Sequence, residues 1–299
     1  MHPSGVINVN KPAGPTSHDV IAIVRRGTGV KRVGHAGTLD PLASGVLPVL
    51  VGAATRLSEY LLGHDKHYRA TVRFGATTET LDAGSPAIPG GRADFRPDEI
   101  EEALERFRGP VAQIPPAYSA IKVGGRKAYA MARAGEPVEL TSRRVTFYEL
   151  KVLAWASPDL ELDIHCSSGT YIRSLARDLG LALGTGAYLA KLERRAVGGF
   201  TLEDSIALTD LKVAMAEGNW QTHLISPADA LPDLPALPLD QAQALQLIHG
   251  RPIRREPGSP SGLVRGLGSN GELVALLKPD ALGHDWRPEK VFHTSFEQD

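Results

Sequence analysis

The spacing of apolar and polar residues predicts three helices in the first two-thirds of the chain. Residues 97–109 begin with Pro and acidic residues, end with Arg, and stop at Gly-Pro, an arrangement that suits the helix dipole and marks both ends. Residues 169–184 carry an apolar face at helical spacing. Residues 17–29 have the same pattern, with Ser17 as a plausible N-cap.

Strand patterns lie between these helices. Residues 67–75, 143–155 and 160–167 alternate in part and are rich in strand formers. The last two segments flank a Ser-Pro-Asp turn, which predicts an antiparallel pair. No Gly-rich nucleotide motif follows a strand, which disfavours nucleotide-cofactor folds. We therefore predict an α+β fold with a mixed, largely antiparallel central sheet flanked by helices and loops.

A Pro-rich segment, LPDLPALPLD at 231–240, is the clearest break in composition and reads as a stiff linker. The tail beyond it opens with a helix-like run, DQAQALQLIHG, and continues with two strand-like runs, SGLVRGL and GELVALLK. The sequence thus predicts a large domain over 1–230, followed by a linker and a small β-rich domain over 231–299.

Composition is that of a globular protein, with 42% hydrophobic and 22% charged residues. Cys166 is the single cysteine, so we expect no intrachain disulfide and a reducing compartment. The N-terminus resembles no signal peptide, and the longest apolar run is far shorter than the roughly 20 residues of a membrane span. We expect a cytoplasmic protein with no membrane association.

The net charge of −1 hides an uneven distribution. Residues 1–60 hold six basic and three acidic residues, and two basic clusters without acids occupy 25–32 and 122–133. Local patches rather than total charge set the affinity for phosphates. These clusters are candidate nucleic-acid contacts, with an ordinary solvated surface as the alternative.

The stretch GHAGTLDPLASGVLPVLVG, residues 34–52, holds one histidine, His35, and one carboxylate, Asp40, ahead of an apolar run. Its glycines permit tight turns, and Pro41 restrains Asp40 to extended geometry. Such a loop can hold a catalytic side chain rigidly. Asp before Pro is also a common turn residue, so the residues alone leave both readings open.

Three further places could carry chemistry. Arg173 falls in the first turn of a predicted helix, where a cation opposes the dipole and is often matched by an anion, although it could be a surface arginine. Tyr68 enters a predicted strand as a site or core aromatic, and Leu192 precedes a basic strand edge, Arg194 and Arg195. Metal-binding and serine-hydrolase motifs are absent from the sequence.

Together these segments resemble the TruB family of tRNA pseudouridine synthases. The resemblance runs in family order over roughly residues 5–200, through INVNKPAGPTSHDVI, GHAGTLDPLASGVLPVLVGAATRL, HYRATVRFGATTETLDAGSP, IPPAYSAIKVGGRKAYAMARAGEPVEL and GTYIRSLARDLG. The tail is similar in size and position to the family's PUA-type RNA-binding module. One departure is Glu193, where the family usually has Arg; Arg195 partly restores the basic character of that edge.

The resemblance implies a role for each matching residue. Asp40 would be the catalytic carboxylate, acting on the sugar as a nucleophile or at C2′ as a base. Arg173 would pair with Asp40 and orient it, and Tyr68 would stack on the flipped uracil and relay a proton from C5. Ten more residues are implied as substrate contacts or supports of the loop: Lys11, His35, Asp82, Lys122, Arg126, Lys127, Arg133, Tyr171, Leu192 and Arg194.

The implied activity is isomerisation of uridine 55 in the T loop of tRNA, by base flipping, glycosidic cleavage and reattachment through C5. Glycosidases normally use two carboxylates; here the uracil stays in the pocket, so one can suffice. The resemblance implies the pseudouridine synthase fold, an RNA-gripping insertion near 115–140, no metal or organic cofactor and no obligatory protein partner. Nothing in the sequence demands more than a monomer. The alternatives are a tRNA-folding chaperone whose catalysis is secondary and a guide-RNA-dependent synthase, which the insertion argues against.

Overall fold

A computed structural model describes residues 3–119 and 121–292, except for the side chains of Lys122 and Lys127. Its large sheet has the order β14-β1-β3-β12-β4-β11-β10-β7, with β13 on β12 and β2 on β3. The strands are β1 (Gly5–Lys11), β2 (Val33–His35), β3 (Ser44–Val51), β4 (Lys66–Phe74), β7 (Gly109–Gln113), β10 (Arg143–Ala156), β11 (Asp159–Cys166), β12 (Ala187–Val197), β13 (Phe200–Thr201) and β14 (Ile206–Ala207).

The predicted sheet type is confirmed. Most neighbouring strands are antiparallel, including the predicted β10–β11 pair, whereas β3–β12 and β1–β14 are parallel. Strand β4 alternates buried and exposed positions along its length, because its even residues, such as Tyr68 and Val72, enter the core while Arg69 and Arg73 face solvent.

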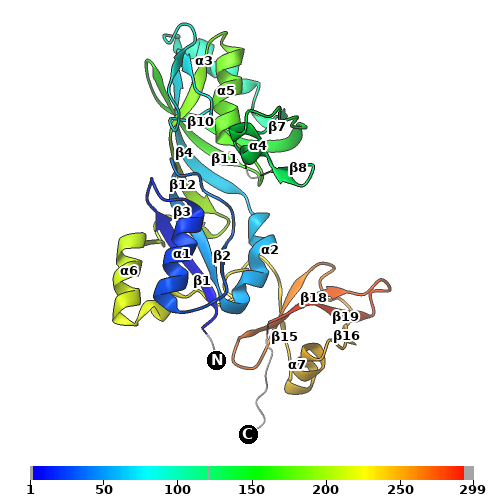
Figure 1. Cartoon of the computed structure of the whole chain (residues 1–299). Helices are drawn as coiled ribbons and strands as arrows, with labels where there is room; N and C mark the ends of the chain where they lie inside the picture. Colours follow the sequence, from blue (N-terminus) through cyan, green and yellow to red (C-terminus); the bar gives the residue numbers. More distant parts are fainter. Residues whose placement is uncertain (1–2, 120, 293–299) are drawn as a thin grey trace.

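Helices pack at both ends of this sheet. Figure 1 shows α1 (Ser17–Thr28) beside α6 (Leu208–Glu217), and α5 (Ile172–Ala182) near α3 (Pro97–Glu105) at the other end. Helix α3 ends before the predicted residue 109, because that glycine already begins β7. Helix α5 begins after the predicted residue 169, because Tyr171, its N-cap, is still extended. Short elements complete this domain: η1 (Gly52–Leu57), α2 (Ser58–Leu62), β5 (Ala76–Thr77), β6 (Ile88–Pro89) and η2 (Trp220–His223).

The N-cap of α1 differs from the prediction. Thr16, not Ser17, caps the helix: its hydroxyl accepts the Asp19 N–H, and the Asp19 carboxylate accepts the Thr16 N–H. This reciprocal capping box leaves the Ser17 hydroxyl free to bond elsewhere.

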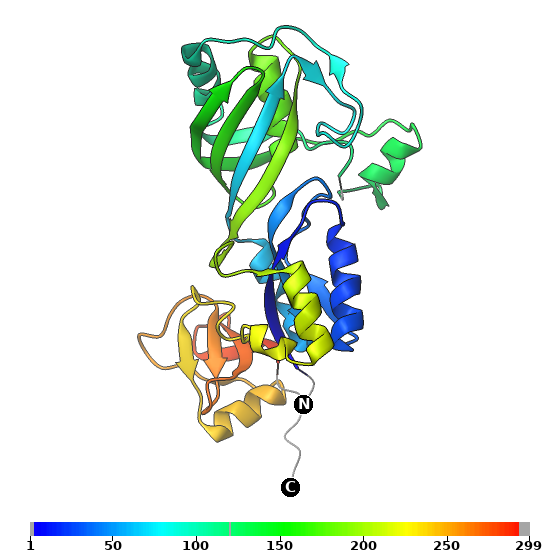
Figure 2. The same ribbon diagram turned by 90° about the vertical axis from the view of Figure 1, so that its left-hand side faces the viewer.

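The insertion contains a hairpin of β8 (Lys122–Val123) and β9 (Arg126–Lys127), followed by α4 (Ala128–Arg133). Gly124 and Gly125 both have positive φ, which the two-residue turn of this hairpin requires. Figure 2 shows the insertion standing clear of the large sheet. The hairpin and α4 are therefore exposed, and they join the rest of the domain only at their base, which we call the root of the insertion.

The C-terminal residues form a second sheet of order β15-β17-β18-β19-β16. Its strands are β15 (Ala236–Pro238), β16 (Ile253–Arg254), β17 (Val264–Leu267), β18 (Leu273–Pro279) and β19 (Asp285–Val291), accompanied by α7 (Gln241–Ile248). The helix and the two strands predicted for this tail are confirmed. Part of the predicted linker is itself a strand, because β15 pairs with β17.

The small domain is fixed against the large one. Leu276 and Phe292 join an apolar cluster with Leu57 of η1, and Tyr60 packs against that cluster. Lys290 pairs with Glu59 and lies over the Tyr60 ring. Figure 1 shows the small domain beside α2. The described part of the chain contains no helix that is both long and apolar enough to cross a membrane.

Candidate active site

Asp40 lies in a loop between β2 and β3 and presents a carboxylate that is 34% exposed. The Ala43 N–H donates to the Asp40 carbonyl and closes a turn. Gly37 and Gly45 hold positive φ on either side, and a Cβ at Gly45 would come within 2.2 Å of the Arg194 carbonyl oxygen. The loop therefore needs these two glycines, as the sequence indicated.

Ser17 and Gly14 tie this loop to the N-terminal segment. The buried Ser17 hydroxyl accepts the Leu39 N–H at 2.8 Å and donates to the Leu39 carbonyl at 2.9 Å. The Gly14 N–H donates to the Pro41 carbonyl at 2.8 Å. Because these bonds hold the residues on both sides of Asp40, its position is set by backbone contacts from outside the loop.

Arg194 holds the same loop from beneath. It is 1% exposed, and its guanidinium donates to three loop or strand carbonyls, those of Gly37, Thr38 and Val46. We expected Arg194 to be a substrate contact. The structure instead buries it under the loop, where its donors satisfy protein carbonyls, so it is placed to support the site rather than to touch RNA.

Arg173 connects Asp40 to two other segments. Its Nε lies 3.0 Å from an Asp40 carboxylate oxygen, although the N–H does not point along that line and makes no hydrogen bond. Its two terminal nitrogens donate to the carbonyls of Thr80 and Tyr118. Arg173 is only 6% exposed, so this mostly buried cation joins the Asp40 loop, the 78–84 loop and the root of the insertion.

Asp82 is the second carboxylate beside Arg173. One of its oxygens lies 3.6 Å from the guanidinium, and the other accepts from the Thr80 hydroxyl and the Gly84 N–H. Asp82 is 7% exposed. These contacts suit a structural partner of Arg173, because a buried cation needs compensating charge.

Tyr68, Leu192 and Tyr171 lie on the neighbouring strands and at the start of α5. Tyr68 and Leu192 are buried on adjacent strands β4 and β12. Burial raises the pKa of Tyr68, partly countered by Arg194, and burial also raises the pKa of the half-buried Tyr171. Both phenols are therefore protonated near neutral pH, and these side chains supply an aromatic and apolar wall for a base.

Lys11 and His35 are polar groups near the loop. The Lys11 ammonium is buried and donates to the carbonyls of Pro12 and Pro15, and desolvation lowers its pKa to about 8 despite the attraction of Asp40. The His35 Nδ1 is buried without a partner, and burial lowers the pKa of this ring. Its edge meets the His18 ring, 5.8 Å away between centroids.

The insertion places the expected cations away from this group. Arg126 is exposed and forms a two-bond ion pair with Glu136, and Arg133 is exposed at the end of α4. The side chains of Lys122 and Lys127 lie outside the described part of the structure. On β12, which lies inside the large sheet, Arg195 pairs with Glu203 and with Glu193. The charge of Arg195 is thus locally neutralised.

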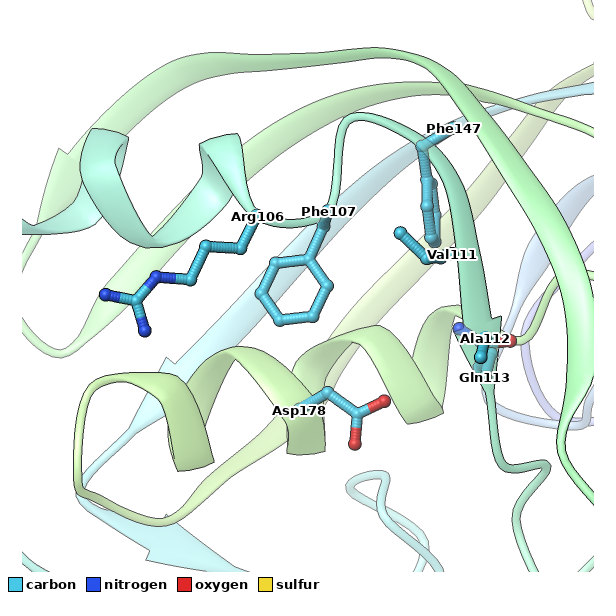
Figure 3. Close-up of a pocket in the computed structure, with 7 residues that line it drawn as sticks. All are labelled: Arg106, Phe107, Val111, Ala112, Gln113, Phe147 and Asp178. Carbon is cyan, nitrogen blue, oxygen red and sulfur yellow. The ribbon is translucent and has the colours of Figure 1, made fainter.

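Two hollows lie outside the Asp40 group. Figure 3 shows a pocket of about 310 Å³ between the α3–β7 turn and α5, lined by Arg106, Phe107, Val111, Ala112, Gln113, Phe147 and Asp178. A groove of about 610 Å³ lies at the root of the insertion, beside Ile121, Arg143 and Gly169. We place the candidate site at Asp40, because the charged groups Arg173 and Asp82 and the residues that hold the loop, Ser17 and Arg194, surround Asp40 and do not line these hollows. In the described residues, no three His, Cys, Asp or Glu side chains gather to bind a metal.

Two positioning residues were missed from the sequence. Ser17 was read as a cap, although Thr16 and Asp19 already have capping-box spacing and could have released it for another role. No feature of the sequence indicated a positioning role for Gln113. Its buried carboxamide accepts the Tyr171 N–H and donates to the Tyr171 carbonyl, which fixes the chain just before Arg173.

Comparisons with known proteins agree over nearly the whole chain. Family models match at 25–172 (TruB family pseudouridylate synthase, N terminal domain), 173–231 (tRNA pseudouridylate synthase B C-terminal domain) and 234–293 (tRNA Pseudouridine synthase II, C terminal). A protein named tRNA pseudouridine synthase B from Caldanaerobacter subterraneus subsp. tengcongensis is 40% identical over 98% of this chain and 100% of its own. One of the same name from Synechocystis sp. is 44% identical over 97% and 99%. A chain in a solved structure titled as a Cbf5-Nop10-Gar1 complex has a TM-score of 0.75 and 30% identity, covering 98% of this chain and 86% of that one.

Proposed function

The chain belongs to the TruB family of tRNA pseudouridine synthases, and from this premise we propose that it converts uridine 55 in the T loop of tRNA to pseudouridine. The observation that carries the proposal is Asp40, one partly exposed carboxylate in a clamped loop, paired with the buried Arg173 from a distant helix. A carboxylate held in this way can act repeatedly in one geometry.

The proposed reaction starts with a uridine flipped out of the T loop, because its reacting atoms are hidden in folded RNA. Asp40 attacks C1′ or removes a proton from C2′, and the N1–C1′ bond breaks with its electrons leaving on the uracil. The uracil then turns within the site and bonds to C1′ through C5. If Asp40 attacked C1′, the Asp40–C1′ bond breaks as C5 bonds and its electrons return to the carboxylate; if Asp40 removed the C2′ proton, it returns that proton to C2′ as C5 bonds. Loss of the C5 proton and protonation of N1 restore the aromatic ring, so the product is an isomer of the substrate.

The wall residues support the turning step. Tyr68 stacks on the uracil, and Leu192 packs against it on the neighbouring strand. Because burial keeps the Tyr68 phenol protonated, it can relay the C5 proton only by passing its own proton to an acceptor at the same time. Arg173 holds the Asp40 carboxylate while the charge on the sugar and base changes.

The decisive experiment replaces Asp40 with Asn. We expect Asp40→Asn to fold and bind an unmodified tRNA transcript but to form no pseudouridine, measured as tritium release from C5-labelled tRNA and mapped at position 55. Asp98→Asn is the matched control, since Asp98 is exposed on α3 and pairs with Arg96. Full activity in Asp40→Asn would remove Asp40 from the chemistry, and modification at another uridine would overturn the site assignment.

We also propose that the enzyme works as a monomer in the cytoplasm, without an obligatory protein partner. The small domain, with boundary near residue 231, would add RNA affinity as a PUA-like module. Activity of the purified protein on naked tRNA tests this proposal. A requirement for a guide RNA or for added proteins would favour the guide-dependent alternative instead.

A further inference from the structure

Four cations at the end of α1 have no acidic partner in the part of the chain that the structure describes. Arg25 and Arg26 lie in the last turn of α1, and Lys31 and Arg32 follow in the turn before β2; all four are exposed. Within the described residues, none of the four forms an ion pair. Arg25 donates weakly to the Val33 carbonyl at 3.4 Å. We call Arg25, Arg26, Lys31 and Arg32 the α1 patch.

Several other surface arginines of the large domain are paired with acids, although the exposed Arg133, Arg143 and Arg144 also form no ion pair among the described residues. Arg69 and Arg73 on the open face of the sheet pair with Glu161 and Asp159. The arginines of the α3 region are paired in the same way, as Arg92 and Arg106 are with Glu99 and Glu102. The helix dipole accounts for cations in the last turn of α1. It does not account for Lys31 and Arg32, which lie beyond the helix.

Helix α1 and the residues after it link the active-site loop to the segment that contacts the small domain. The first turn of α1 carries Ser17, which holds Leu39 beside Asp40. Arg26 follows nine residues later, about 14 Å along the helix axis at 1.5 Å per residue. At the other side, the Gly52 N–H donates to the Arg32 carbonyl, and Arg56 of the same η1 segment bonds to Val291 of the small domain.

From this arrangement we propose that the α1 patch binds the phosphate backbone of the tRNA outside its target loop. The inference rests on the proposed function, because it takes Asp40 as the place of the target nucleotide. The chain has a net charge of only −1, so it cannot attract a polyanion as a whole. Cations without an acidic partner among the described residues, on the helix that leads away from the active-site loop, supply that attraction locally.

The test is the triple variant Arg26→Gln/Lys31→Gln/Arg32→Gln, which leaves Arg25 in its contact with Val33. The Kd for a full-length tRNA transcript is measured by fluorescence anisotropy over a range of KCl concentrations. Each lost phosphate contact lowers the slope of log Kd against log salt by about 0.7 to 0.9. We expect the slope to fall by about two, and Kd near 0.15 M salt to rise roughly tenfold, with kcat at saturating tRNA unchanged.

The matched control is Arg92→Gln/Arg96→Gln/Arg106→Gln, which removes the same charge from arginines that already have acidic partners. Thermal melting followed by circular dichroism verifies that both variants fold. An unchanged slope in the α1 variant, or an equal change in both variants, would overturn the proposal. A minimal stem–loop should lose less affinity than full-length tRNA, and equal losses would contradict a contact outside the target loop. Failure of the proposed function is a separate result: the wild-type protein would form no pseudouridine, whatever its salt slope.

Discussion

The Asp40 loop and the insertion would both contact RNA in the proposed function, yet they are held in opposite ways. The loop is fastened by groups outside it that bond to its backbone: the buried Ser17 and Arg194 side chains and the Gly14 N–H. The insertion is mostly exposed and carries a surface ion pair, Arg126–Glu136. Exposed pairs of this kind contribute little, about 0 to 1 kcal/mol.

The difference teaches how the molecule divides its work. A carboxylate that must meet one atom of a sugar needs a fixed backbone, because small displacements are costly in rate. A segment that grips a large, variable polyanion can adjust, since phosphate contacts depend on charge more than on exact direction. Arg173 belongs to both regions, because it pairs with Asp40 and donates to Tyr118 at the insertion root.

Of the changes that test this comparison, Arg173→Gln should lower kcat the most. The change removes the charge beside Asp40 and leaves Asp82 as a buried carboxylate without its cation. Arg173 contributes an ion pair to Asp40 and charge-assisted hydrogen bonds to the carbonyls of Thr80 and Tyr118, interactions of about 1.5 to 3 kcal/mol, so kcat should fall roughly 10- to 100-fold. Tritium release under saturating tRNA measures the loss. Arg177→Gln, one turn later on α5, is the control and should keep nearly full activity; comparable losses in both variants would mean that only helix stability was affected.

Ser17→Ala tests the clamp on the loop without touching any charge. Loss of the hydroxyl leaves the Leu39 N–H and carbonyl without their buried partner, at a cost of about 1 to 3 kcal/mol in the free energy of unfolding. We expect kcat to fall about tenfold with KM unchanged, because Asp40 is held less firmly.

Thr16→Ala is the control for Ser17→Ala. It removes the neighbouring N-cap and costs about 1 kcal/mol of stability without loosening Leu39. A kcat near that of the wild-type protein is expected at temperatures well below the melting point. If Thr16→Ala lowered kcat as much as Ser17→Ala, the effect would belong to α1 stability and the clamp would have no separate role. Rescue by Ser17→Thr, which restores a hydroxyl, would support the clamp.

Local pattern was enough to predict several elements, and the reason is physical. Helix α7 and the β10–β11 pair are specified by periodicity and by neighbouring turns, which act within a short stretch of chain. The parallel pairing of β12 with β3 joins residues about 150 positions apart, and nothing local specifies it. For the same reason the contact between Asp40 and Arg173 followed only from the family resemblance.

Arg194 shows a prediction that the pattern could have corrected. Successive residues of a strand face opposite sides, so Arg194 shares its face with the apolar Leu192 and should be buried with it. We read the charge as a sign of an exposed edge and gave the charge more weight than the alternation. Gln113 is different, because a buried carboxamide that mimics a backbone partner has no recognisable spacing.

A smaller effect is expected from the ion pair in the insertion, and it sharpens the contrast with the loop. Arg126→Gln should raise KM about threefold at low salt, whereas Glu136→Gln frees Arg126 and should leave KM unchanged or lower it. Neither change should alter kcat, because the pair is exposed and separate from Asp40. Steady-state kinetics at two salt concentrations measures both. An increase in KM for Glu136→Gln would show that the pair organises the insertion rather than competing with RNA.

The last effect concerns stability against pH rather than catalysis, and it separates the buried cation near the loop from exposed ones. Desolvation lowers the folded-state pKa of Lys11 to about 8, below its ordinary 10.5. Between these values the unfolded chain binds more protons than the folded one at this residue, so its contribution to stability rises with pH from about 8 to about 10.5. The free energy of unfolding, measured by urea titration, should therefore rise between pH 7 and pH 9 by about 1 kcal/mol more in the wild-type protein than in Lys11→Met. Lys66 has a similar shift in both proteins and cancels. The exposed Lys151 provides the control, because the free energy of unfolding of Lys151→Met should change with pH by as much as that of the wild-type protein. If Lys11→Met showed that same pH response, Lys11 would not be desolvated beneath the loop.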